Sequence, residues 1–198
     1  MCIRDSLRTA RRVSHVFVMD VPTYAKLLLI TDAAVNILPS LEDKADTIAN
    51  AIELAQALGI ATPKVAILSA VETVTAKLPS TIEAAALCKM AERGQIKGGL
   101  LDGPLAFDNA ISKEAARTKG ITSDVAGDAD ILLVPDLEAG NMLAKTLTFL
   151  GGADAGGIVL GVRVPIVLTS RADSGAARMA SCAIAVLQAN RTLSLIHI

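Results

Sequence analysis

Short runs of branched apolar residues alternate with alanine-rich amphipathic segments along most of this chain. The apolar runs at 14–19, 26–31, 65–70, 131–134, 158–160 and 166–168 have the length and branching of strands. The segments at 41–58, 81–93, 109–119, 142–150 and 176–189 place apolar residues on one helical face. Strands that alternate with helices are typical of a largely parallel sheet covered by helices. The sequence therefore predicts an α/β fold.

Polar residues at the boundaries of these segments predict where helices begin and end. Ser40, followed three residues later by Asp43, has the pattern of a capping box in its acidic form. Ser80 is placed to cap the helix at 81–93. Gly59 follows the first helix, at a position where glycine commonly ends one. A further short strand is predicted to end at Asp102-Gly103-Pro104.

The composition argues against several classes of function. Aromatic residues make up 2% of the chain and 19 basic residues balance 20 acidic ones, so nucleic-acid binding is not predicted. No apolar run is long enough to span a bilayer, and the first residues lack the apolar centre of a secretory signal. Three widely spaced cysteines and two histidines show no metal-ligand or Ser/His pattern. These features predict a cytoplasmic protein with reduced thiols, no membrane contact and no metal.

The two ends of the chain, 1–6 and 193–198, resemble translated sequencing-adapter read-through. On this interpretation they carry no fold information, the natural N-terminus lies upstream, and His197 has no functional meaning. The alternative is that both ends are ordinary frayed termini.

A hydroxyl, a guanidinium and a carboxylate lie within four residues where the strand at 166–168 ends and the last helix begins. They belong to Ser170, Arg171 and Asp173. Open α/β sheets bind ligands at such edges, a helix N-terminus favours anions, and a guanidinium forms a planar fork suited to phosphate. This pattern predicts an anion site. The alternative is that Asp173 or Ser174 only caps the helix and that Arg171 is solvated.

A second junction between a strand and a helix carries Asp136, Gly140 and Asn141. Asp136 can cap the helix, Gly140 would let the backbone approach a ligand, and Asn141 offers both a donor and an acceptor. A plain turn explains this junction equally well. The same two alternatives apply to Asp102 and Asp108 near the earlier strand end.

Other motifs of nucleotide and acyl chemistry are missing. The sequence contains no G-x-G-x-x-G, Walker A or G-x-S-x-G pattern, so dinucleotide redox chemistry, nucleotide hydrolysis and a nucleophile elbow are not predicted. His15 begins the first strand, where a lone histidine is more often structural than catalytic.

Four stretches together resemble the phosphate acetyltransferase/phosphate butyryltransferase family. They are L-R-T-A-R-R, L-L-D-G-P-L-A-F-D-N-A, V-A-G-D-A-D-I-L-L-V-P-D-L-E-A-G-N-M-L-A-K and V-P-I-V-L-T-S-R-A-D-S, within a likeness that covers residues 7–192. The chain is most similar to the phosphate acyltransferase part of bifunctional enoyl-CoA hydratase/phosphate acetyltransferase proteins. The resemblance implies a two-domain αβα sandwich similar to isocitrate and isopropylmalate dehydrogenases, with a cleft between the domains. It implies an incomplete first domain with 7–20 and 161–192 as its remnant, and a second domain at 21–160.

The same resemblance implies transfer of an acetyl or short, butyryl-like acyl group between coenzyme A and orthophosphate to give an acyl phosphate. Acyl-CoA and phosphate are then substrates, no cofactor is needed, and a homodimer is expected. By resemblance Ser170 donates through its hydroxyl, Arg171 contacts phosphate or coenzyme A, and Arg8 is the matching arginine of the first domain. Asp136, Gly140, Asn141 and Asp102 are the further candidates for substrate contact.

The general base departs from the family pattern. In the acetyltransferase branch a catalytic aspartate lies seven residues after the serine of the S-R pair, and Ala177 stands at that position here, as in the butyryltransferase-like branch. We expect Asp173 to replace this base, with helix capping as its alternative role. The departure also motivates a second hypothesis, a non-catalytic α/β module that is a degenerate paralogue or a dimerisation piece.

A third hypothesis, a hydroxy-acid dehydrogenase of the related fold, would need dinucleotide and metal ligands that the sequence lacks. Catalysis between two domains depends on both walls of the cleft. With its first domain truncated, this chain by itself is therefore expected to be poorly active.

Overall fold

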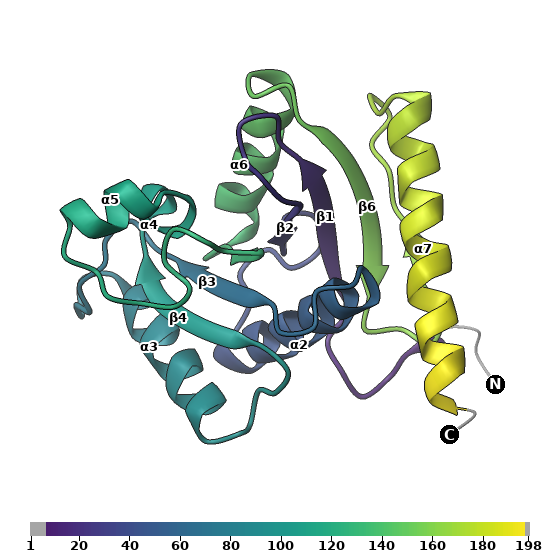
Figure 1. Ribbon diagram of the computed structural model, residues 1–198. Helices are drawn as coiled ribbons and strands as arrows, with labels where there is room; N and C mark the ends of the chain where they lie inside the picture. Colours follow the sequence, from purple (N-terminus) through teal and green to yellow (C-terminus); the bar gives the residue numbers. More distant parts are fainter. Residues whose placement is uncertain (1–6, 197–198) are drawn as a thin grey trace.

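The alternating pattern of the sequence produces the expected alternation of strands and helices. The computed structural model describes the backbone of residues 7–196 and the side chains of residues 7–191. The strands are β1 (Ser14–Asp20), β2 (Leu28–Thr31), β3 (Lys64–Leu68), β4 (Leu100–Leu105), β5 (Ile131–Leu133), β6 (Asp154–Leu160) and β7 (Ile166–Val167). The helices are α2 (Leu41–Ala57), α3 (Pro79–Glu92), α4 (Phe107–Ile111), α5 (Lys113–Thr118), α6 (Leu137–Phe149) and α7 (Gly175–Ile196) (Figure 1).

The described strands form one sheet in the order β4-β3-β5-β2-β1-β6-β7. Strands β2, β3, β4 and β5 are parallel to one another, whereas β1 runs antiparallel to both β2 and β6, and β7 runs antiparallel to β6. Five of the seven strands therefore point the same way, with β1 and β7 against them. The predicted α/β fold with a largely parallel sheet is confirmed.

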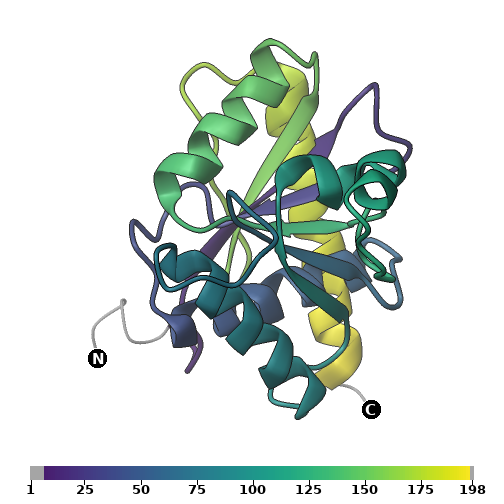
Figure 2. The same ribbon diagram turned by 90° about the vertical axis from the view of Figure 1, so that its left-hand side faces the viewer.

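Helices cover both faces of this sheet (Figure 2). One apolar cluster lies between the sheet and α2, α3 and α7, and includes Ile48, Leu87 and Ile184. The other lies under α4, α5 and α6, and is built around Ile30 and Leu132. Within the part of the chain that the structure describes, no helix combines the length and apolar character needed to cross a membrane.

Several predicted boundaries are confirmed and others are wrong. The capping box holds, with Ser40 and Asp43 bonding to each other's backbone amides. Strand β4 ends at Leu105, one residue after the predicted end at Asp102-Gly103-Pro104, because its pairing with β3 resumes at Leu105 after a register shift. Ser80 does not cap α3; the helix starts earlier, at Pro79, where a missing N–H costs nothing.

The predicted helix at 109–119 is two short helices. Ser112 ends α4 and is also the N-cap of α5, because its side chain accepts a hydrogen bond from the amide of Ala115. A serine that can bond its own downstream backbone favours such a break over a continuous helix.

The predicted division into domains stays a prediction. Within the described residues β1 pairs with β6 from Ser14 to Asp20 and with β2 on its other side, so 14–20 and 21–160 share one sheet. Residues 1–6 and 197–198 lie outside the described residues, and α7 continues to Ile196.

Candidate functional site

A pocket of about 500 Å³ lies between α6 and the segment that leads into α7. We call it the α6–α7 pocket. Strands β1 and β6 form its floor, and Figure 1 shows α6 and α7 on either side of these two strands. Its polar lining includes His15, Asn141, Lys145, Thr148, Asp154, Ser170 and Asp173. The pocket therefore joins residues from four distant stretches of sequence.

Residues 168–173, named the 168–173 loop, form a tight turn at the edge of this pocket. The Ser170 amide donates to Asp173 Oδ2 at 2.6 Å, and the Asp173 amide donates to the Ser170 carbonyl at 3.2 Å. Helix α7 is capped by Ser174, whose hydroxyl accepts the amide of Ala177 at 3.1 Å. Of the two capping candidates it is thus Ser174 that caps the helix, while Asp173 closes the turn before it.

Arg171 lies in this turn between two residues that line the pocket. Its side chain is exposed and takes part in none of the ion pairs formed among the described residues. A free guanidinium next to a helix N-terminus is available to an anionic ligand.

The opposite wall of the pocket is α6, whose N-cap residue is Asp136. Asp136 caps this helix by accepting the amide of Ala139 at 2.8 Å. Asn141 lines the pocket, and its side-chain nitrogen donates to the Ala33 carbonyl at 3.2 Å, while its side-chain oxygen accepts no hydrogen bond recorded among the described residues. Gly140 is buried, and a Cβ there would lie 2.7 Å from a methyl group of Val134. The space beside Gly140 is therefore filled by helix–strand packing, not left open for a ligand.

Of the predicted substrate contacts, Arg8, Asp102, Asp136 and Gly140 do not line this pocket. Arg8 forms an isolated bridge with Val162, which follows the carboxyl end of β6. The 168–173 loop instead continues from β7 toward the amino end of β6, because β7 runs antiparallel to β6. Asp102 lies on β4, the opposite edge strand of the sheet, where its carboxylate accepts the amide of Gly103 at 2.8 Å.

The structure adds Lys145 and Thr148 to the pocket, both missed from the sequence. Their signal is spacing, because residues four and seven positions after Asn141 lie on the same face of a helix. Lys145 forms no ion pair within the described residues although it shares the pocket with two carboxylates, Asp154 and Asp173. The pocket thus presents a free cation opposite the Ser170 turn.

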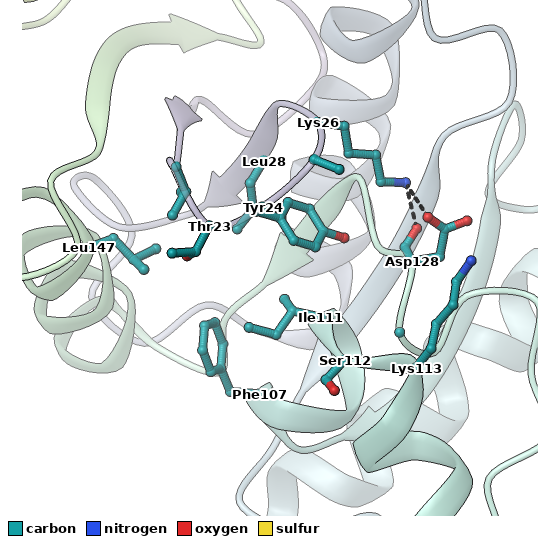
Figure 3. Close-up of a pocket in the computed structure, with 13 residues that line it drawn as sticks. Thr23, Tyr24, Lys26, Leu28, Phe107, Ile111, Ser112, Lys113, Asp128 and Leu147 are labelled. Atoms are coloured by element: carbon teal, nitrogen blue, oxygen red, sulfur yellow. Dashed lines mark hydrogen bonds and ion pairs between the residues drawn. The ribbon is translucent and has the colours of Figure 1, made fainter.

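A larger cavity of about 780 Å³ lies at the amino ends of β2 and β5 (Figure 3). The ammonium group of Lys26, which lines this cavity, contacts three protein oxygens: the Asp128 carbonyl at 2.7 Å, Asp128 Oδ1 at 3.0 Å and Asp130 Oδ1 at 2.6 Å. Lys64 binds the other Asp128 oxygen at 2.6 Å and holds the pKa of that carboxyl at about 2. These charges tie strand ends together and are already paired within the protein.

The residues that the structure describes contain no cluster of His, Cys, Asp and Glu able to hold a metal ion. The polar groups that line the α6–α7 pocket are hydroxyl, amide, carboxylate, imidazole and ammonium groups.

Comparison with known proteins places this geometry in a family. The sequence pattern described as "Phosphate acetyl/butaryl transferase" matches residues 2–186. The chain belongs to this family. A phosphate acetyltransferase of Rhizobium meliloti is 73% identical over 185 residues, which are 93% of this chain and 58% of the relative. A phosphate butyryltransferase of Clostridium acetobutylicum is 50% identical over 183 residues, 92% of this chain and 61% of the relative.

A solved structure agrees with this membership of the phosphate acetyl/butyryl transferase family. A branched-chain phosphotransacylase from Enterococcus faecalis V583 superposes with a TM-score of 0.85 at 38% identity, over 95% of this chain and 67% of the other. The chain thus spans about three fifths of the length of the Rhizobium and Clostridium relatives. Membership in the phosphate acetyl/butyryl transferase family confirms the resemblance seen in the sequence.

Proposed function

We propose that the α6–α7 pocket serves acyl transfer between coenzyme A and orthophosphate, with an acetyl or short acyl group as cargo. The observation that carries this proposal is that Ser170, Asp173 and Lys145 converge on one pocket at the N-terminus of a 22-residue helix. Hydroxyl and ammonium donors beside a helix dipole suit a phosphoryl group and an oxyanion. Family membership supports the same chemistry.

In the proposed reaction coenzyme A gives its thiol proton to a carboxylate, and the thiolate attacks the carbonyl carbon of the acyl phosphate. The carbon–sulfur bond forms and the carbonyl oxygen carries the negative charge. The carbonyl double bond then re-forms, the bond from the carbonyl carbon to the phosphate oxygen breaks, and orthophosphate leaves and takes the proton from the carboxylate. Asp173 is the proposed proton acceptor, because one of its oxygens closes the turn and the other has no hydrogen-bond partner among the described residues.

The remaining groups bind and stabilise charge. The Ser170 hydroxyl donates to the oxyanion, while Arg171 and Lys145 hold the phosphate from the two sides of the pocket. Asn141 offers its free side-chain oxygen to an amide N–H of the pantetheine arm. Coenzyme A and phosphate act as substrates, so the proposal needs no cofactor.

The proposed function also implies a cellular location and an assembly. The chain acts in the cytoplasm, where acyl-CoA is found, and a homodimer is the proposed assembly. Arg8 stays a proposed contact only for an arrangement in which further chain brings it to the cleft, because the structure places it at Val162.

The test combines binding and turnover. Binding of coenzyme A and orthophosphate to this chain is measured by calorimetry, and acyl phosphate formation from acetyl-, propionyl- and butyryl-CoA is measured in the complete gene product. Arg171→Ala is expected to weaken phosphate binding about tenfold, in line with a charge-assisted contact, whereas Arg178→Ala on the exposed side of α7 is the matched control. Absence of both turnover and coenzyme A binding would overturn the proposal. The non-catalytic module, which is motivated by Ala177 at the position of the family's catalytic aspartate, would then be favoured.

A further inference from the structure

His15 is buried beneath the 168–173 loop, on the floor of the α6–α7 pocket. Its side chain is 1% exposed, and its ring packs edge-on against Phe17 with centroids 4.4 Å apart. The ring nitrogen Nδ1 is buried and has no hydrogen-bond partner. A buried acceptor without a hydrogen-bond partner lowers the stability of the folded protein, so its presence calls for an explanation.

The other side of the ring meets the loop. The backbone carbonyl of Leu168 faces the imidazole as a hydrogen-bond acceptor and raises the pKa of the ring. Nε2 is the nitrogen on that side, because a Cβ on Gly157 would lie 2.7 Å from Nε2 and 2.8 Å from the Leu168 oxygen. The hydrogen bond thus assigns the neutral ring its Nε2–H form, with a lone pair on Nδ1.

A pair of glycines on β6 makes room for this arrangement. The absent side chain of Gly157 leaves space for His15 and the loop on one face of the strand. The absent side chain of Gly156 leaves space for Ile184 of α7 on the other face, since a Cβ there would lie 2.7 Å from it. The amide of Gly157 also donates to the Ser181 hydroxyl of α7 at 2.9 Å. The loop and the start of α7 are therefore held against β6 from both faces.

Leu168 lies two residues before Ser170, which is bound to Asp173. This bond joins the backbone of Ser170 to the Asp173 carboxylate, so a shift at Leu168 displaces both groups. We propose that neutral His15 is a positioning residue that holds the 168–173 loop over the α6–α7 pocket, and that protonation of this imidazole releases the loop. The consequence for catalysis rests on the proposed function of the pocket.

The direction of the effect follows from the burial of the ring. Burial lowers the pKa of His15 below its ordinary value of 6.5 and outweighs the Asp32 charge, the Leu168 carbonyl and the Asp173 charge, which all raise it. Asp154 and Lys145 line the same pocket and add one charge of each sign. A proton on Nδ1 would place a charge and an unpaired donor in the buried site, which favours displacement of the loop in acid.

Two substitutions separate the hydrogen bond from the proton. In His15→Gln the side-chain amide can reach the position of Nε2 and donate to Leu168, but it cannot be protonated. In His15→Asn the amide is too short to reach the carbonyl and stays polar. The loop is expected to keep its position in the first variant at every pH and to lose it in the second.

The decisive measurement is made by NMR on the 198-residue chain, without any substrate. The chain has two histidines, so His197→Asn assigns the two imidazole signals. We expect His15 to be the Nε2–H form at pH 7.5 and to titrate below 6.5. The exchange protection factors of the Ser170 and Asp173 amides should fall at least tenfold through that titration. They should be independent of pH in His15→Gln and low throughout in His15→Asn.

The outcomes decide the proposal without reference to catalysis. Equal loop protection in the wild type and His15→Asn, or a His15 titration that leaves the loop unchanged, would overturn it. In the complete gene product, His15→Gln should remove the part of the acid decline of kcat/KM that follows the His15 titration. If the wild type shows no turnover the proposed function fails, while the NMR result still decides whether His15 positions the loop.

Discussion

The amide nitrogen of Ser170 lies 2.6 Å from Oδ2 of Asp173. The hydroxyl and the carboxylate of the S-R-A-D sequence are thereby joined in one turn, and a single residue both shapes the loop and supplies the proposed base. The two roles can be separated, because an amide oxygen accepts the same hydrogen bond but does not take up a thiol proton.

Asp173→Asn is therefore expected to keep the turn and lose the base. Turnover should fall by about 10²–10⁴-fold, the usual contribution of a general base, with the thermal midpoint almost unchanged. Asp173→Ala should lose turnover and also the exchange protection of the Ser170 amide. Normal turnover in Asp173→Asn would assign the base elsewhere, with Asp154 as the next carboxylate in the pocket.

Lys145→Ala is expected to weaken substrate binding more than the chemical step. An exposed charge contact contributes up to about 1 kcal/mol, so KM for phosphate should rise about fivefold with kcat nearly unchanged. Lys145→Arg should retain most of the affinity, and the effect should shrink at high salt. The control is Lys77→Ala, an exposed lysine that lies outside both the α6–α7 pocket and the larger cavity. An unchanged KM would remove Lys145 from the site.

Ala177→Asp tests the position where the family's acetyltransferase branch carries its aspartate. Ala177 lines the pocket and is the third residue of α7, after the Ser174 cap. A carboxylate in the first turn favours the helix, so we expect a gain of about 0.5 kcal/mol in the free energy of unfolding. Combined with Asp173→Asn, the substitution should restore part of the lost turnover. A stable double variant without any recovery would show that Ala177 does not face the reacting thiol.

Acid should weaken the strand ends around Asp128. The hydrogen bond from Lys64 lowers the pKa of this carboxyl from 3.8 to about 2. A group with a lowered folded-state pKa stabilises the protein above its unfolded value and loses that contribution as the pH falls from about 4 to about 2. Urea unfolding at a series of pH values measures this slope, which should be smaller in Asp128→Asn. The same slope in both proteins would exclude Asp128 as its source.

Local features of the fold followed from short-range sequence patterns. The capping box at Ser40, the strand–helix order and the S-R-A-D junction before α7 depend on residues within a few positions of one another. Such patterns predicted the α/β class, and combined motifs predicted the family. They were wrong where two local preferences competed, as at Ser80 and Ser112.

Gly140 and Asp102 show the limit of local prediction for the site. For each residue the sequence leaves a ligand contact and a plain turn open; in the structure the space beside Gly140 is taken by Val134, and Asp102 lies on the far edge strand. Whether a strand end faces a ligand depends on the order of strands in the sheet, which no short stretch of sequence specifies.

The sequence by itself determined the class of fold, the family and the chemical character of the turn at Ser170. Only the tertiary structure placed Lys145 across from that turn and buried His15 beneath it, because β1, α6 and the 168–173 loop meet through sheet pairing rather than proximity in the chain. The role of His15 depends on the missing side chain of Gly157, 142 positions along the sequence. Such a contact is set by packing, and so it is visible only once the sheet is assembled.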